Sequence, residues 1–391
     1  MSAQVISFGC RLNLAEAEGI RALLAEAEDL IVVNSCAVTA EASRQTRQAI
    51  RRARREQPDA RLLVTGCGAE IDRAALSAMP EIDGLIANGA KLDPRAYNVS
   101  AATVCAPPSA HSRAFVAVQN GCDHSCTFCA IPQGRGPSRS CDIAAVVSAV
   151  AAQLDRGARE VVLTGVDLTS WGHDLPGTPK LGALAEAILV ACPGLTRLRL
   201  SSLDGIEIDA ALFELLASEA RVMPHVHLSL QSGHDLTLKR MKRRHLRGDA
   251  VGLVERLRAR RSDVSIGADL IAGFPTEDAA MHAANLSIIG ELGVVHGHIF
   301  PYSPRPGTPA ARMPQVDPRE VRARAAELRD EVARVRDDWL RSLLGTQLSV
   351  LAERDGTGHA QNFARVQLPA GAKAGTIVPI TPRQVAAGLL A

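Results

Sequence analysis

The 391 residues carry a formal net charge of only +2, which by itself says little about the partners of the protein. No segment approaches the run of about 20 apolar residues that a membrane helix needs. We also expect no secretory leader, which argues against a membrane or exported protein and predicts a soluble, cytoplasmic chain.

Strands and helices are predicted to alternate over the first hundred residues. Apolar runs predict strands at residues 4–8, 29–33 and 61–65, and helical patterns follow at residues 13–26, 41–56 and 72–78. Strands that alternate with helices favour a parallel sheet built from βαβ units. We therefore expect residues 1–105 to form an N-terminal parallel-sheet α/β domain.

A second run of strand–helix units is predicted after a linker at residues 92–112, which contains Pro94, Pro107 and Pro108. Six strands are expected, at residues 115–118, 160–163, 197–200, 226–230, 264–270 and 294–300. This repetition predicts a partial or full TIM-like β/α barrel over residues 106–340, ending in a long charged helix from residue 318 to 344. Residues 341–391 contain short β-like pieces and predict a small all-β module, with strands at 347–352, 363–367 and 376–380.

Three of the nine cysteines lie within eight residues, directly after a predicted strand. Cys122, Cys126 and Cys129 form a C-x-x-x-C-x-x-C motif. Three thiolates can hold three irons of a 4Fe–4S cluster and leave the fourth iron open to a small ligand. A zinc site is the alternative, since His124 could add the fourth ligand that zinc normally requires. The β/α units that follow the motif favour the cluster.

A second set of three cysteines is dispersed in the sequence. Cys10, Cys36 and Cys67 each lie just past one of the first three predicted strands. Because parallel strands end at one edge of a sheet, and open α/β sheets bind ligands there, these cysteines are predicted to meet at a second cluster. The alternative is three unrelated cysteines near strand ends. Cys105, Cys141 and Cys192 match no motif and are expected to be structural or surface residues.

The close-spaced motif at the start of a β/α barrel resembles the radical S-adenosylmethionine superfamily. The resemblance makes the cluster of Cys122, Cys126 and Cys129 the radical-generating centre and S-adenosylmethionine a cofactor. Further positions that match cofactor-binding residues are Phe128, Thr164, Gly165, Ser201, Gln231 and Asp269. Four histidines, His225, His227, His296 and His298, alternate along two predicted strands; they could bind a metal, although a role in lining the barrel is favoured.

The two cysteine sets together resemble the methylthiotransferase family over nearly the whole chain. The matching motifs are GCRLN, NSCAVT and TGCGAE at residues 9–13, 34–39 and 65–70, the stretch from 122 to 140 with its trailing arginines, and residues 238–245 and 300–313. The resemblance implies two 4Fe–4S clusters and a C-terminal module of the TRAM type. It also implies a reducing electron donor whose identity the sequence does not reveal.

Members of this family differ in substrate. GCRLN and NSCAVT are most similar to the group that modifies threonylcarbamoyl-adenosine beside the tRNA anticodon. The alternatives are isopentenyl-adenosine in tRNA and an aspartate of a ribosomal protein. A non-catalytic iron–sulfur protein that binds RNA is an alternative of another class.

Basic residues support an RNA partner. Arg44, Arg47 and Arg51 recur along one predicted helix, and Lys239, Lys242 and Arg243 form a second cluster. Such stripes are typical of nucleic-acid binding, although solvated helix faces are the ordinary alternative. Phe363 could stack on RNA or pack within the β module.

Overall fold

The computed structural model describes residues 2–99 and 112–391. The chain divides into two compact units. Unit 1 comprises Met1–Ser109, Gln119–Arg139 and Ser303–Ala311, and unit 2 comprises Ala110–Val118, Ser140–Tyr302 and Arg312–Ala391. The predicted domain boundary at residues 105 and 106, Pro107, Pro108 and Cys105 lie outside the described residues.

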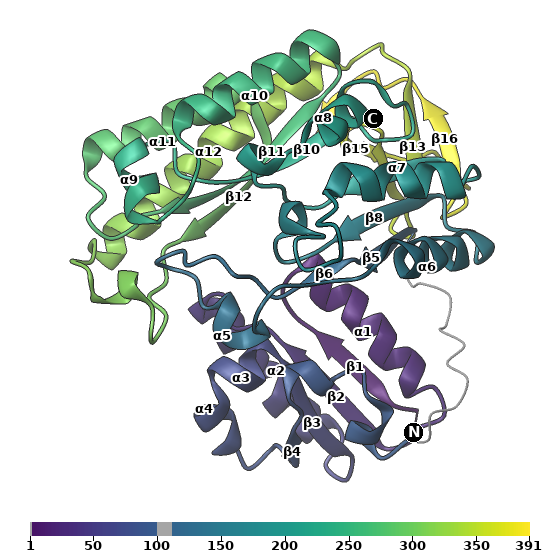
Figure 1. Cartoon of the computed structure of the whole chain (residues 1–391), viewed down its shortest axis with the longest axis vertical. Helices are drawn as coiled ribbons and strands as arrows, with labels where there is room; N and C mark the ends of the chain where they lie inside the picture. The colour runs from purple at the N-terminus through teal and green to yellow at the C-terminus, as the bar shows by residue number, and fades with distance from the viewer. Residues whose placement is uncertain (1, 100–111) are drawn as a thin grey trace. The chain divides into compact units, whose positions relative to one another are not determined.

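The core of unit 1 is a parallel sheet. Its strands are β1 (Gln4–Ser7), β2 (Leu30–Ser35), β3 (Arg61–Gly66) and β4 (Gly84–Leu85), paired in that order. The two long helices are α1 (Arg11–Leu23) and α2 (Ala40–Glu56) (Figure 1). Parallel pairing throughout confirms the α/β class predicted for this part of the chain.

Alternating strand residues bury apolar side chains on both faces of this sheet. On one face, Ile20 of α1 packs in a cluster with Val32 and Leu63. On the other face, Ile50 of α2 packs in a cluster with Ile31 and Leu62. The strands are therefore nearly continuous apolar runs, as expected for a parallel sheet covered on both sides.

Short helices complete unit 1. They are α3 (Cys67–Ile71), α4 (Arg73–Ser77), α5 (Ile131–Arg135) and the 3-10 turns η1 (Asn88–Ala90) and η2 (Pro94–Tyr97). The turn from β3 into α3 requires glycine at Gly66, where φ is +90° and a Cβ would lie 2.4 Å from the carbonyl oxygen of Ser35. This close approach places the first residue of α3, Cys67, directly at the end of the sheet.

Unit 2 contains six parallel strands with helices between them, arranged as a partial β/α barrel. They form the sheets β5-β8-β9 and β10-β11-β12, which isolated bridges join at Leu198–Val222 and Leu203–Leu228. The strands are β5 (Arg113–Ala117), β8 (Glu160–Thr164), β9 (Arg197–Leu200), β10 (His225–Gln231), β11 (Ser265–Ala272) and β12 (Val294–Pro301). This arrangement confirms the predicted β/α class of the middle region.

Helices lie along these strands (Figure 1). Leu, Val and Ile side chains from the strands and helices form one large apolar core. The helices are α6 (Ile143–Asp155), α7 (Leu181–Ala191), α8 (Ala210–Ser218), α9 (Asp235–Arg240), α10 (Arg247–Arg260), α11 (Ala279–Leu292) and α12 (Pro318–Ser342). Cys192 is buried in this core, and Cys141 is exposed. Both agree with the expectation of structural or surface cysteines.

The C-terminal part of unit 2 is a small sheet of six strands, which confirms the predicted all-β module. Its strand order is β16-β13-β14-β15-β18-β17. The strands are β13 (Leu348–Ala352), β14 (Thr357–Ala360), β15 (Arg365–Gln367), β16 (Ile377–Ile380), β17 (Val385–Ala386) and β18 (Leu389–Leu390). The turn between β14 and β15 carries Phe363.

Phe363 packs against the barrel strands. Its ring lies 4.7 Å from the ring of His225 and 4.5 Å from that of His359, and the Arg199 guanidinium lies 4.7 Å from its centroid. The neighbouring Asn362 carbonyl accepts a 2.5 Å hydrogen bond from Ser265. Of the two alternatives for Phe363, the structure favours packing over RNA stacking.

No helix in residues 2–99 or 112–391 combines the length and the apolar character needed to cross a bilayer.

Candidate functional site

The close-spaced cysteines lie in unit 1, between β6 (Gln119–Asn120) and α5. Backbone hydrogen bonds fold this loop: Cys122 N–H donates to the Gly136 carbonyl at 3.2 Å, and Cys129 N–H donates to the Cys126 carbonyl at 3.2 Å. Gly121 makes the close approach possible, since a Cβ there would lie 1.9 Å from the Pro137 carbonyl oxygen.

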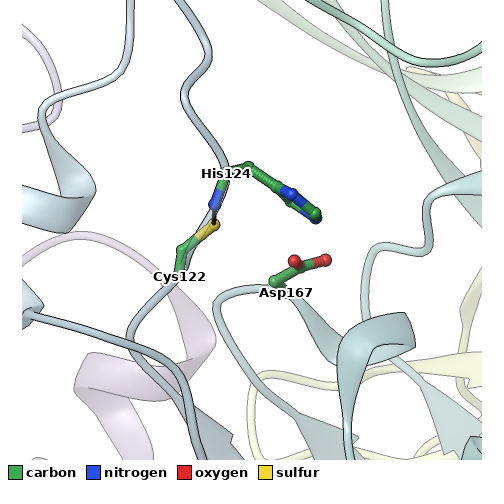
Figure 2. A group of neighbouring side chains, drawn as sticks. All are labelled: Cys122, His124 and Asp167. Carbon is green, nitrogen blue, oxygen red and sulfur yellow. Dashed lines mark hydrogen bonds between the residues drawn. The ribbon is translucent and has the colours of Figure 1, made fainter. Parts of the chain in front are cut away.

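Two sulfur atoms of this loop accept backbone hydrogen bonds. Cys122 Sγ accepts from the backbone N–H of His124 at 3.4 Å (Figure 2), and Cys129 Sγ accepts from that of Ile131 at 3.4 Å. Asp167, the third residue drawn in Figure 2, belongs to unit 2. Amide donors that point at sulfur stabilise thiolate charge, and hydrogen bonds to the sulfurs are one of the ways in which proteins tune iron–sulfur clusters.

The dispersed cysteines lie at the carboxyl end of the unit 1 sheet, as their placement after the strands predicts. Cys10 is the N-cap residue of α1, Cys36 directly follows β2, and Cys67 directly follows β3. Cys36 and Cys67 are buried, whereas Cys10 is exposed. All six cysteines of the two sets therefore belong to the same compact unit.

The buried thiols of the dispersed set influence one another electrostatically. Burial raises the pKa of the Cys36 thiol to about 11; the Val38 backbone N–H opposes this, and the charges of Cys67 and Cys10 add to it. Burial also raises the pKa of the Cys67 thiol, and the positive charges of Arg135 and Lys91 offset only part of this rise. Such thiols stay protonated until a metal displaces the proton.

The proposed cofactor residues of the barrel lie mostly at strand ends. Thr164 ends β8, Gly165 follows it, Ser201 follows β9, and Gln231 ends β10 with a positive φ of 70°. Ser201 Oγ is buried and has no hydrogen-bond partner among the described residues, so it can bind a ligand. Phe128 belongs to unit 1, and the other five belong to unit 2.

Asp269 lies in the middle of β11 and joins two histidines. His227 Nε2 and His298 Nδ1 each lie 3.0 Å from Asp269 Oδ1. Burial acts to raise the pKa of Asp269, but the hydrogen bonds from the two histidines outweigh it and hold the pKa well below its ordinary value. The three side chains are also close enough to share a metal ion.

The other two histidines, His225 and His296, lie on β10 and β12, two residues before His227 and His298. His225 and His296 lie 5.4 Å apart, and burial lowers the pKa of His296 to about 3. Each also packs against the ring of Phe363. These contacts are those of barrel-lining residues.

The arginines of α2 are mostly paired with acids. Arg44 pairs with Glu41 at 2.5 Å, and Arg51 lies 3.7 Å from Glu81. Exposed pairs of this kind are weak and readily exchange partners. Arg44 and Arg51 are exposed and Arg47 is half-buried, so this helix can still offer cations to a phosphate backbone.

The second basic cluster separates into two kinds of residue. Lys239 and Lys242 are exposed. The side chain of Arg243 is only 9% exposed; it donates to Asp204 at 3.0 Å and to the Ser229 carbonyl at 2.8 Å. Arg243 therefore anchors the segment after α9 to Asp204 and to β10, whereas the two lysines face solvent.

A buried network of charged residues lies beside the dispersed cysteines and was missed in the sequence analysis. Arg135, Glu16 and Lys91 have side chains that are 2%, 4% and 3% exposed. They lie far apart in the chain, so neither spacing nor periodicity links them. The only available signal was the position of Arg135 among the arginines that trail the radical motif.

Two known protein families match the regions of the chain that contain the two cysteine sets. A family model described as the Radical SAM superfamily matches residues 116–285, and one described as Uncharacterized protein family UPF0004 matches residues 2–87. Each cysteine set therefore falls within one matched region.

The chain is 43% identical to the threonylcarbamoyladenosine tRNA methylthiotransferase MtaB of Rickettsia prowazekii (strain Madrid E), over 93% of this chain and 91% of that protein. It is 33% identical to a tRNA-2-methylthio-N(6)-dimethylallyladenosine synthase of Parafrankia sp. (strain EAN1pec), over 93% of this chain and 81% of that protein. Among solved structures, the radical S-adenosylmethionine methyltransferase TsrM of Kitasatospora setae has a TM-score of 0.56 at 15% identity, over 80% of this chain and 75% of that chain. The last similarity concerns the fold alone.

Proposed function

The chain belongs to the radical S-adenosylmethionine methylthiotransferases, and we propose that it converts N6-threonylcarbamoyladenosine next to the tRNA anticodon into its 2-methylthio derivative. The observation that carries the proposal is the presence of two separate sets of three cysteines in one compact unit. The 43% identity to a relative named for this substrate favours it over the isopentenyl compound.

The residues present fit two 4Fe–4S clusters. Cys122, Cys126 and Cys129 would hold one, in a loop whose amides already donate to two of the sulfurs. Cys10, Cys36 and Cys67 would hold the other. When bound, the first cluster supplies the electron that cleaves S-adenosylmethionine, and the second holds the sulfur that is transferred.

The barrel residues bind and orient the cofactor and the substrate. The unpartnered Ser201 hydroxyl, the Thr164 hydroxyl and the Gln231 amide are suited to the polar groups of S-adenosylmethionine, together with Gly165. Phe128, in the close-spaced cysteine loop of unit 1, is proposed as a further cofactor-binding residue. Asp269 stays ionised and holds His227 and His298 in fixed orientations.

On this proposal the chain has three functional regions: residues 1–105 for the dispersed cysteines, residues 106–340 for radical chemistry, and residues 341–391 as a TRAM-like module. Arg44, Arg47, Arg51, Lys239 and Lys242 contact the tRNA backbone, and Arg243 supports that surface from within. The enzyme works in the cytoplasm, where tRNA is found, and takes electrons from a low-potential reductant.

Gly9 offers a direct test of the dispersed site. Its φ is +96°, and a Cβ would lie 2.8 Å from both Cβ and Sγ of Cys36. Gly9→Ala should cost about 1–2 kcal/mol in backbone strain alone, and it pushes against a ligand sulfur. We expect iron in the reconstituted protein to fall from about eight toward about four per chain.

Gly157→Ala is the matched control, because Gly157 has a comparable φ of +88° and a Cβ there meets no atom within 4 Å. It should keep the full iron content. Equal iron in both variants would argue against a cluster beside Cys36.

The substrate is tested by nucleoside mass spectrometry. Reduced enzyme is incubated with S-adenosylmethionine, a sulfur source and tRNA that carries either the threonylcarbamoyl or the isopentenyl group. We expect the methylthio product on the threonylcarbamoyl tRNA. Product on the isopentenyl tRNA alone, or on a ribosomal protein alone, would assign a different substrate. Absence of 5′-deoxyadenosine would indicate a non-catalytic protein.

A further inference from the structure

Arg135 ends α5, six residues after Cys129, and its guanidinium is buried against the other cysteine set. Nη1 donates to Glu16 at 2.8 Å and to Asn120 at 2.8 Å, and Nη2 donates to Asn13 and to Glu16. A bidentate contact of this kind fixes both position and orientation.

Asn13 extends the contact to the loops that carry the dispersed cysteines. Its side-chain amide donates to the Phe8 carbonyl at 2.7 Å and to the Ser35 carbonyl at 3.2 Å, just before Cys10 and Cys36 respectively. Arg135 therefore bonds to Asn13, which in turn bonds to the backbone at the ends of both β1 and β2.

Helix α5 also contacts the third cysteine. The Gly134 carbonyl accepts a 2.6 Å hydrogen bond from Asn88. A Cβ on Gly134 would lie 3.3 Å from Cβ of Cys67, so the backbone of α5 packs directly on this ligand. Helix α5, which follows the loop of Cys122, Cys126 and Cys129, thus packs against the dispersed cysteine site.

The network carries an unbalanced charge. Arg135 and Lys91 bring two positive charges, and Glu16, which bonds to both, brings one negative charge. Burying an extra cation is costly unless an anion lies nearby. The charge lies beside the dispersed cysteines, because Gly134, the residue before Arg135, packs on Cys67 and Asn13 bonds to the Ser35 carbonyl next to Cys36. Cluster-bound thiolates at these positions would provide the missing negative charge.

We propose that Arg135 is a positioning residue which holds the two cysteine sets in one rigid body and sets the reduction potential of the cluster bound by Cys10, Cys36 and Cys67. This inference rests on the proposed function. A buried positive charge stabilises the reduced, more negative state of a cluster and so raises its potential. The surplus charge of the network is well suited to this role, since burial leaves it weakly screened.

Two substitutions should move the potential in opposite directions. Arg135→Gln removes a positive charge and should shift the potential of this cluster to more negative values, and Arg135→Lys should restore it in part. Glu16→Gln keeps the shape but removes the negative charge, so the potential should shift to more positive values. Arg95→Gln should leave it unchanged, because the side chain of this unit 1 arginine is 89% exposed and pairs only with Asp93 among the contacts described.

The measurement is a redox titration of the full, anaerobically reconstituted chain, followed by electron paramagnetic resonance. Added S-adenosylmethionine identifies the radical-generating cluster by its altered spectrum. Opposite shifts for Arg135→Gln and Glu16→Gln support the proposal; shifts of the same sign, or none in either variant, overturn it. If Arg135→Gln fails to load iron, the direction of the Glu16→Gln shift still decides. The proposed function fails separately, if the wild-type chain binds one cluster or makes no methylthio product.

Discussion

Replacing Cys126 with alanine is expected to reduce 5′-deoxyadenosine formation to background. The residue is the middle cysteine of the close-spaced set, in a loop held by the Cys129–Cys126 backbone hydrogen bond and by amide donors to Cys122 and Cys129. With two thiolates left, a cluster with a single open iron cannot be maintained. Iron should fall to about four per chain, the share of the other cluster.

The measurement is the yield of 5′-deoxyadenosine from dithionite-reduced protein, together with iron per chain. Cys141→Ala is the control, because this cysteine is exposed and is close in sequence to the motif. It should keep both quantities at wild-type levels. Substantial 5′-deoxyadenosine from Cys126→Ala would show that this loop does not hold the radical-generating cluster.

Replacing Cys36 and Cys67 together with alanine should separate the two halves of the reaction. Both thiols are buried at the carboxyl end of the unit 1 sheet, and alanine fits the space of either. Loss of this site should abolish the methylthio product while 5′-deoxyadenosine is still formed, because the radical loop keeps its three cysteines. Iron should again fall to about four per chain.

Product nucleosides and 5′-deoxyadenosine are measured in the same reaction. Cys192→Ala controls for the loss of a buried thiol, since Cys192 lies in the unit 2 core. That variant should make both products. Continued methylthiolation by the double variant would show that the dispersed cysteines do not hold the transferred sulfur.

The parts of the site that follow from strand order were predictable. Cys36 and Cys67 directly follow β2 and β3, and the predicted strands end within two residues of the observed ones. Because the sheet is parallel, carboxyl ends share one edge, and a one-dimensional pattern is enough to bring distant cysteines together. The strands of the barrel were equally clear, because apolar residues form a short run in β8 (EVVLT) and alternate with polar residues in β9 (RLRL) and β10 (HVHLSLQ).

Features that depend on tertiary contact were not predictable. The strand β14 (Thr357–Ala360) contains Gly358 and His359 and lacks an apolar run, and it forms because β13 and β15 pair on either side. Arg243 looks like part of a basic stripe, but the buried Asp204 draws it inward. Burial acts to raise the pKa of Asp204, but hydrogen bonding from His245 and the charge of Arg243 outweigh it and lower the pKa to about 2.

The Arg135 network shows the same limit most clearly. Glu16, Lys91 and Arg135 meet only after the sheet, η1 and α5 have folded around them. A buried cation in a helix of five residues has no signature in composition or periodicity. Its partners become apparent only from the three-dimensional contacts.

Iron and acid-labile sulfide per chain in the anaerobically reconstituted wild-type protein test the central claim most directly, combined with Mössbauer spectroscopy to count cluster types. The two cysteine sets predict about eight irons per chain in two 4Fe–4S clusters. About four irons in a single cluster type, after complete reconstitution, would contradict the account.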